Sequence, residues 1–371
     1  MENSSVTENK KSVSPETYNS GHLYNFTGTH CCEPDVNGNS TCSPYCCSNP
    51  QFFPPVLNPT HEFEEKLHVV VPISNYHRYK SRYRLFLNFK KSIEKNPYVI
   101  LYIVEIALGD RPFAVTEPNN PRHLQLRTKD EIWQKERSIN LMVQRFPPTW
   151  QYMMAVDGDI LFQNENFAQE IIHELQHNPV VQPFQNVVNL GPDGEIDSTY
   201  PSFAFQYFKD PESVKANKNK RYSFPHPGFG LCMRRDIFDS VGGFFDSAIL
   251  GSGDHHAFYC FIGRADMSMP NNISEGYKKA VKEYEERCKR YIKGRIGYVK
   301  GIIHHQWHGK FKSRKYQERW SILINNNFDP STDLKYDWQG LYQIDEDKPQ
   351  LAIDIYKYMK LRNEDSIDND K

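Results

Sequence analysis

From Leu67 through the centre of the chain, apolar and polar residues recur with the regular spacings of strands and helices. Residues 68–73 are mostly β-branched, which is typical of a strand buried in a parallel sheet. From residue 79 to residue 93 the apolar positions recur at helical spacing, and Ser74 or Asn75 is placed to cap this helix. Further elements are expected as a strand at 98–105, a helix at 131–145, and strands at 151–156 and 296–303.

The order of these elements predicts an α/β fold with a mixed, mostly parallel sheet flanked by helices, as in Rossmann-like proteins. Residues 106–130 between the second strand and the second helix are interpreted as a loop rich in Pro and Asn. In such sheets ligands bind outside the carboxyl ends of the strands. We therefore expect Ser74, Glu105 and the sequence Asp157-Gly158-Asp159 to lie together at one edge of the sheet.

Residues 1–60 have no apolar periodicity and are rich in Asn, Ser, Thr, Pro and Cys, so a disordered leader is expected there. Five of the eight cysteines lie between Cys31 and Cys47. They favour a metal knot or an unstructured thiol-rich tail over disulfides, although the paired C-x-x-C of a standard zinc site is absent. The folded domain is expected over 61–330, and a C-terminal extension over 331–371 is expected to pack on it and to end in an acidic tail.

Charge and hydropathy exclude several classes of protein. Lys and Arg number 45 against 46 for Asp and Glu, and a net charge of -1 gives no basic field that would recruit nucleic acid. The longest apolar run is 98–104, far shorter than the roughly 18 residues that a membrane-spanning helix needs. Residues 1–20 are polar and lack the apolar centre of a signal peptide, so a cytoplasmic protein without a membrane span is expected.

The sequence Asp157-Gly158-Asp159 directly follows the apolar strand at 151–156. Side chains two residues apart on an extended backbone point the same way, so both carboxylates can face one cation. Hard oxygen ligands suit Mg²⁺ or Mn²⁺, which usually completes its coordination with substrate phosphates. The alternative is a simple turn. The apolar residues at 160–162 do not fit an EF-hand, and Leu161 weakens the interpretation as an aspartyl-phosphate phosphatase.

Three histidines, His304, His305 and His308, lie within five residues, beside Trp307. Neutral imidazole is a common ligand for divalent ions. If a strand ends at residue 303, His305 is expected to be the third protein ligand and His308 a less direct partner, with His304 pointing away. The alternative is that these histidines are structural.

A glycine-rich segment leads into Asp254, which is expected at the start of a helix. The positive end of a helix favours the ionised carboxylate, and an ionised carboxylate at a turn of close approach is what a general base needs. The alternative is an ordinary N-cap aspartate.

Several ordered motifs resemble those of the GT-A glycosyltransferases, and the β-1,4-galactosyltransferases in particular. They are Val71-Pro72-Ile73-Ser74-Asn75, Lys135-Glu136-Arg137-Ser138-Ile139-Asn140, Val156-Asp157-Gly158-Asp159, and the segment 233–244. Where that family has tryptophans in its acceptor-side motif, this chain has Leu250 and Ser252, so acceptor specificity does not carry over. Other stretches look closer to family-two-like transferases of bacteria and large viruses. The resemblance covers about residues 67–325.

The resemblance implies a metal-dependent hexosyltransferase of GT-A fold. It would move a sugar from a nucleotide-sugar, by default a UDP-sugar, to a hydroxyl of a glycan or glycoprotein acceptor, with inversion and with Mn²⁺ or Mg²⁺ as cofactor. The implied base is Asp254, and the implied metal ligands are Asp157, Asp159, His305 and His308. The implied donor-binding residues are Pro72, Ser74, Glu105, Lys135, Arg137 and Asp157.

Two details of this interpretation stay open. Helical spacing lets only one of Lys135 and Arg137 face the donor. Because His255 and His256 stand where acids are expected, a catalytically silent carbohydrate-binding protein is an alternative, and a metal-dependent phosphohydrolase is another.

Overall fold

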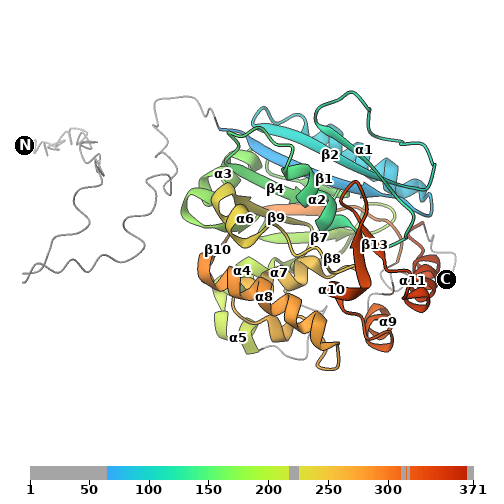
Figure 1. The fold of residues 1–371 in the computed structure, drawn as a ribbon. Coiled ribbons are helices and arrows are strands. Elements are labelled where there is room, and N and C mark those ends of the chain that lie inside the picture. The colour runs from blue at the N-terminus through green and yellow to red at the C-terminus, as the bar shows by residue number, and fades with distance from the viewer. Residues whose placement is uncertain (1–64, 217–224, 311–314, 316–317, 366–371) are drawn as a thin grey trace, which may run out of the picture. The chain divides into compact units, whose positions relative to one another are not determined.

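A seven-stranded mixed sheet lies at the centre of the described chain, in the order β10-β6-β9-β4-β1-β2-β3 (Figure 1). The computed structural model describes residues 65–216, 225–310, 315 and 318–365. The central strands are parallel, whereas β9 runs antiparallel to both of its neighbours. The predicted α/β fold with a mixed, mostly parallel sheet is therefore confirmed. The strands are β1 Leu67–Ser74, β2 Val99–Leu108, β3 His123–Thr128, β4 Tyr152–Val156, β6 Val180–Gln182, β9 Gly230–Arg234 and β10 Ile296–Tyr298.

Helices cover both faces of this sheet, which explains the continuous apolar runs of its central strands. Val69 and Val71 of β1 pack in one cluster with the apolar residues of α1 (Lys80–Ile93) and α3 (Phe167–His177). Val70 points to the opposite face and belongs to a second cluster. The helices of that second face are α2 Lys135–Val143, α6 Arg235–Val241, α7 Gly253–Phe261 and α8 Glu275–Tyr291.

A second, four-stranded sheet in the order β5-β11-β7-β8 continues from the end of β4. Its β11 is antiparallel to β5 and parallel to β7, so that His305 lies opposite Ile160 on one side and Asn189 on the other. This pairing brings the residues after β4 next to the histidines of β11. The strands are β5 Ile160–Phe162, β7 Asn186–Leu190, β8 Ile196–Pro201 and β11 Ile302–His305.

The last part of the described chain packs on α2. The side chain of Gln134 donates to the carbonyl of Tyr342 at 2.9 Å and accepts from the amide of the same residue at 2.9 Å. These bonds attach the hairpin of β12 and β13 to the start of α2. The remaining elements are α4 Phe203–Lys209, α5 Pro211–Ala216, a 3-10 turn at Ala265–Met267, α9 Glu318–Asn325, α10 Pro330–Asp333, β12 Leu334–Tyr336, β13 Tyr342–Ile344 and α11 Pro349–Leu361.

Several expected element boundaries are wrong. The strand expected at 296–303 is two strands in different sheets, because the chain turns at 299–301, where Gly301 has a φ of 142°. Residues 123–128, expected to be loop, form the edge strand β3, whose alternate residues are buried. The helix expected at 131–145 is shorter, at Lys135–Val143.

The expected cap of α1 is also wrong. Its N-cap residue is Tyr79, whose amide is held by the side chain of Asn75 at 2.8 Å. The first amides of the helix, those of Lys80 and Ser81, instead donate to the carboxylate of Asp365. The cap thus comes from the far end of the chain.

The expected leader and its cysteine cluster lie outside the described residues. Among the residues that the structure describes, no helix combines the length and the apolar character needed to cross a membrane.

Candidate active site

A cavity of about 500 Å³ opens where β1 and β4 end, at the carboxyl edge that the sequence pointed to. Residues from both sheets, from α2 and α7, and from the C-terminal segment line it. Of the predicted site residues, eight line this cavity: Pro72, Ser74, Lys135, Asp157, Asp159, Asp254, His305 and His308. The two that do not are Glu105 and Arg137.

Asp159, His305 and His308 bring three ligand atoms together within 4.8 Å of one another. The Oδ2 atom of Asp159 lies 3.2 Å from Nε2 of His308 and 3.8 Å from Nε2 of His305. The two Nε2 atoms are 3.1 Å apart. All three residues were predicted as ligands, and the division of His305 and His308 into a direct and a less direct partner stays a prediction.

Backbone and side-chain hydrogen bonds hold Asp159 and the two histidines close to one another. The amide of Gln306 donates to the carbonyl of Asp159 at 2.9 Å, which extends the pairing of β5 and β11. The Nδ1 atom of His305 lies 2.8 Å from Oδ1 of Asn189 on β7. Because an amide oxygen only accepts, Nδ1 of His305 carries the proton and its Nε2 presents a lone pair to the group.

This donor set fits a divalent cation. An unprotonated Nε2 of His305, Nε2 of His308 and a carboxylate oxygen of Asp159 converge within 3.8 Å of one another, as the ligands of one cation do. Two imidazoles and one carboxylate are common ligands of divalent first-row metals, including Mn²⁺. The three residues therefore form a candidate metal site.

The expectation that Asp157 shares this metal with Asp159 is corrected. Residues 157–159 form a turn after β4, not a continuing strand, so the two side chains do not follow the alternation of an extended backbone. Asp157 Oδ1 forms an ion pair with Nζ of Lys135. The carboxylate of Asp157 is therefore directed to α2, while that of Asp159 is directed to β11.

The side chains of Lys135 and Arg137 point to different parts of the molecule, as their spacing on a helix requires. Burial alone would lower the pKa of Lys135, but the neighbouring acids, Asp157 foremost, outweigh it and raise that pKa, so the ammonium stays charged in the cavity. Arg137 donates to the carbonyl of Gly340 at 2.6 Å and forms an ion pair with Asp246 at 3.2 Å. The expected donor contact of Arg137 is thus replaced by a structural role in holding the C-terminal hairpin.

Glu105 is likewise not placed to bind a donor. It is 3% exposed, and its carboxylate accepts hydrogen bonds from the amides of Ala114, Val115 and Thr116 and from the hydroxyl of Thr116 at 2.6–3.0 Å. These four bonds occupy the carboxylate and fold the loop after β2 back onto the strand. We therefore assign Glu105 a structural role.

Asp254 lies in the first turn of α7, as predicted, and faces the cavity. Its Oδ1 accepts from the amide of His255 at 2.7 Å. The preceding Gly253 is required by packing, because a Cβ atom there would lie 2.4 Å from Cδ of Glu136. The start of α7 is therefore pressed against α2, and Asp254 is held at the cavity wall.

Glu136 was not singled out from the sequence, although it lines the same cavity. Its burial, and the negative charges of Asp254 and Asp157, raise its pKa to about 8, against the lowering effect of Lys135. At neutral pH the carboxyl group of Glu136 is mainly protonated. It therefore adds a hydrogen-bond donor, and no negative charge, to this wall of the cavity.

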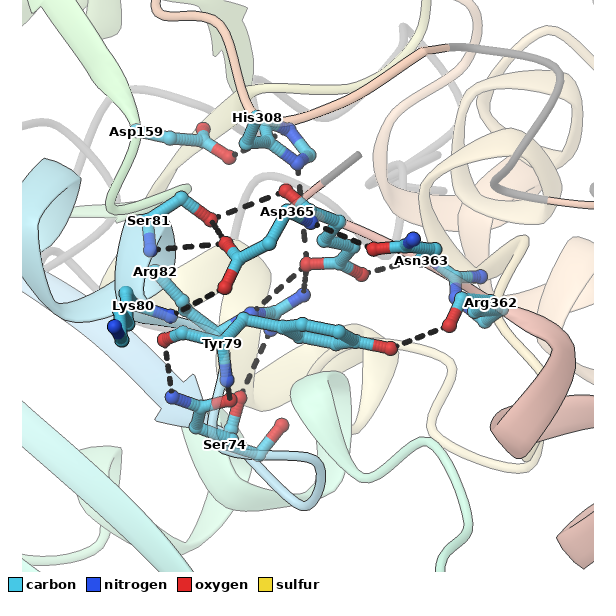
Figure 2. Close-up of polar contacts among 12 residues, drawn as sticks. Ser74, Tyr79, Lys80, Ser81, Arg82, Asp159, His308, Arg362, Asn363 and Asp365 are labelled. Carbon is cyan, nitrogen blue, oxygen red and sulfur yellow. Dashed lines mark hydrogen bonds and ion pairs between the residues drawn. The ribbon is translucent and has the colours of Figure 1, made fainter. Parts of the chain in front are cut away.

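Arg82, Arg362 and Glu364 also line the cavity and were missed by the sequence interpretation. Figure 2 shows the C-terminal segment lying beside the start of α1, close to Asp159 and His308. Arg82 is a helix residue, and the other two lie in a charged stretch without periodicity. No local pattern marks any of them as a site residue.

The sequence matches no protein family model and no curated protein. Solved structures with a similar backbone include a galactosyltransferase and a mannosyltransferase, at low identity. One is a mutant of Drosophila β-1,4-galactosyltransferase 7 in complex with manganese, UDP-Gal and xylobiose, at 12% identity over 77% of this chain and 98% of that chain, with a TM-score of 0.36.

Two further structures are similar at the same level. The mannosyltransferase PcManGT from Pyrobaculum calidifontis, in complex with GDP-Man and Mn²⁺, is 12% identical over 83% of this chain and 73% of that chain, with a TM-score of 0.39. TarS from S. aureus is 12% identical over 71% of this chain and 65% of that chain, with a TM-score of 0.36. The similarity concerns the arrangement of the backbone.

Proposed function

We propose that this chain is a metal-dependent glycosyltransferase that moves a sugar from a nucleotide-sugar donor to an acceptor hydroxyl. The observation that carries the proposal is the meeting, in one cavity, of a divalent-cation ligand group and a separate carboxylate at a helix start. The group is Asp159, His305 and His308, and the separate carboxylate is Asp254. Asp159 also lies in one of the ordered motifs that resemble those of GT-A glycosyltransferases.

The donor end of the reaction needs positive charge, because a nucleoside diphosphate leaves as an anion. A divalent cation held by the three-residue group would neutralise much of that charge. Lys135 adds a fixed ammonium at the same edge, held in place by Asp157. Pro72 and Ser74 at the end of β1 line the cavity and are proposed to contact the donor. The resemblance makes a UDP-sugar the default donor.

The acceptor end needs a base. We assign this role to Asp254, which lies in the first turn of α7 and lines the cavity. As the acceptor oxygen bonds to the anomeric carbon, its proton passes to Asp254, and the bond to the leaving diphosphate breaks with both electrons going to the diphosphate oxygen. One displacement on the opposite face inverts the anomeric configuration, and it requires only one base.

The proposal is tested by following nucleoside diphosphate release from a panel of nucleotide-sugars with Mn²⁺, with and without saccharide acceptors. Acceptor-dependent release that is lost in Asp254→Asn supports the proposal. Asp193→Asn is a matched control, because Asp193 lies in an exposed turn between β7 and β8. Release without any acceptor would indicate a phosphohydrolase, and saccharide binding without release would indicate a carbohydrate-binding protein; either result contradicts the proposal.

A further inference from the structure

The C-terminal segment at 362–365 contacts the candidate metal site, although it lies more than fifty residues beyond His308 in the sequence. Its Glu364 is 3% exposed, and Oε2 of this residue lies 3.8 Å from Nδ1 of His308. The opposite nitrogen of the same ring, Nε2, faces Asp159 and His305. A single imidazole thus links the C-terminal segment to the ligand group.

Two arginines hold the carboxylate of Glu364 in a fixed position, so that it can orient the imidazole ring of His308. Arg82 donates to Oε2 of Glu364 through Nε at 3.0 Å and through a second guanidinium nitrogen, and Arg362 donates to Oε1 at 3.1 Å. The guanidinium groups of Arg82 and Arg362 thus lie against both oxygens of this buried side chain and compensate its negative charge. The group is therefore a fixed, buried carboxylate.

The rest of the segment is anchored on α1 and not on the metal site. The carboxylate of Asp365 caps the first amides of the helix, and the hydroxyl of Tyr79 donates to the carbonyl of Arg362 at 2.5 Å (Figure 2). The hydroxyl of Ser81 donates to the carbonyl of Glu364 at 3.1 Å. These contacts fix the position of Glu364 independently of His308.

Arg82 extends this network to the central sheet. Its NH1 atom donates to the carbonyl of Ser74, the last residue of β1, at 2.9 Å. The same guanidinium therefore joins the end of a central strand to Glu364. The position of the carboxylate opposite His308 is set by the sheet as well as by α1.

We propose that Glu364 is a positioning residue of the metal site and acts through His308. This inference rests on the metal site of the proposed function. A carboxylate facing Nδ1 favours the tautomer that carries the proton there, which leaves the lone pair of Nε2 directed to the ligand group. On His305 the corresponding nitrogen makes a 2.8 Å hydrogen bond to Asn189, whereas Glu364 faces His308 at ion-pair distance. Each histidine thus has its own partner on the side of the ring away from the site.

The test measures Mn²⁺ binding to the full chain by isothermal titration calorimetry, without any nucleotide or acceptor. Glu364→Ala is expected to weaken Mn²⁺ binding about tenfold or more, as loss of an outer partner of a ligating histidine does. Glu364→Gln keeps a side-chain oxygen facing Nδ1 but removes the negative charge, and is expected to lose less. Glu346→Ala, at an exposed glutamate of the same C-terminal region, is the matched control and should bind Mn²⁺ like the parent.

A second comparison separates an effect through His308 from a general loss of structure. In a His308→Ala background, Glu364→Ala should change Mn²⁺ binding by no more than about twofold, because its target ring is gone. The same loss in both backgrounds, or parental or tighter Mn²⁺ binding by Glu364→Ala, would overturn the proposal. If His308→Ala weakens binding while Glu364→Ala does not, only the positioning role fails. If the parent does not bind Mn²⁺, the metal site of the proposed function fails with it.

Discussion

Lys135 and Arg137 lie two residues apart on α2, and their side chains serve different parts of the molecule. Lys135 pairs with Asp157 in the cavity, whereas Arg137 pairs with Asp246 and bonds to the carbonyl of Gly340. One cation therefore belongs to the candidate active site and the other to the attachment of the C-terminal hairpin. Two substitutions of similar size separate these roles.

Lys135→Met is expected to weaken nucleoside diphosphate binding about tenfold, because a fixed positive charge next to the phosphates is lost. Arg137→Met should leave that affinity unchanged but lower the free energy of unfolding by about 2 kcal/mol, since a hydrogen bond and a partly buried ion pair disappear. Calorimetric titration with UDP and Mn²⁺ measures the first quantity, and urea unfolding measures the second. Equal losses of affinity in both variants would refute the division of roles.

Glu105→Gln tests the structural role of that residue. The carboxylate accepts four hydrogen bonds, and the neutral amide, whose NH₂ group cannot accept, leaves some of their donors without a partner. We expect the free energy of unfolding to fall by about 2 to 3 kcal/mol, with no change in the KM for the nucleotide-sugar. A raised KM at unchanged stability would restore the donor-binding role expected from the sequence.

The raised pKa of Glu136 predicts how stability depends on pH. The carboxyl group binds its proton up to about pH 8 in the folded chain but only up to about 4.5 when unfolded. Between these values the folded state holds more protons, so this residue lowers stability as pH rises from 4.5 to 8. Asp254 and Asp157 oppose its ionisation, and Lys135 favours it.

Glu136→Gln removes this effect. One pKa unit corresponds to about 1.4 kcal/mol. The free energy of unfolding of the variant should therefore rise relative to that of the parent by a few kcal/mol between pH 5 and pH 8, and the difference should stay constant above pH 8. Urea unfolding of both proteins at intervals from pH 5 to pH 9 gives the difference. A difference that does not change with pH would show that Glu136 is ionised throughout.

The leader supplies a further prediction. Residues 1–60 have a composition that cannot bury a core, so a chain lacking them should keep its melting temperature and the proposed transferase activity. Differential scanning calorimetry and the diphosphate-release assay measure these two properties. A clear fall in either one would mean that the cysteine-rich stretch packs on the domain.

Much of the site was predictable because its residues follow strands. Parallel strands bring their carboxyl ends to one edge, so Ser74 at the end of β1 and Asp159 after β4 line the same cavity. His305 was found from its residue type and its neighbours, although the strand before it was misplaced. Asp254 was found because glycines and an acid mark the start of α7.

The contacts between residues far apart in the sequence, and one edge strand, could not be derived from the local sequence pattern. Glu364 and Arg82 lie 282 residues apart in the sequence, and neither stands in a motif. The cap that Asp365 provides for α1 is long-range in the same way. The edge strand β3 was missed because it follows a Pro- and Asn-rich stretch, although residues 124, 126 and 128 alternate inward as a strand requires.

The central claim is that Asp159, His305 and His308 hold a divalent cation. The most direct measurement is Mn²⁺ binding followed by electron paramagnetic resonance of the free ion, for the parent and for Asp159→Asn, His305→Ala and His308→Ala. The control is His304→Ala, which removes a histidine that alternates away from the group on β11. We expect at least about tenfold weaker binding in each of the three ligand variants, with parental binding in the control. Parental binding in all four variants would contradict it.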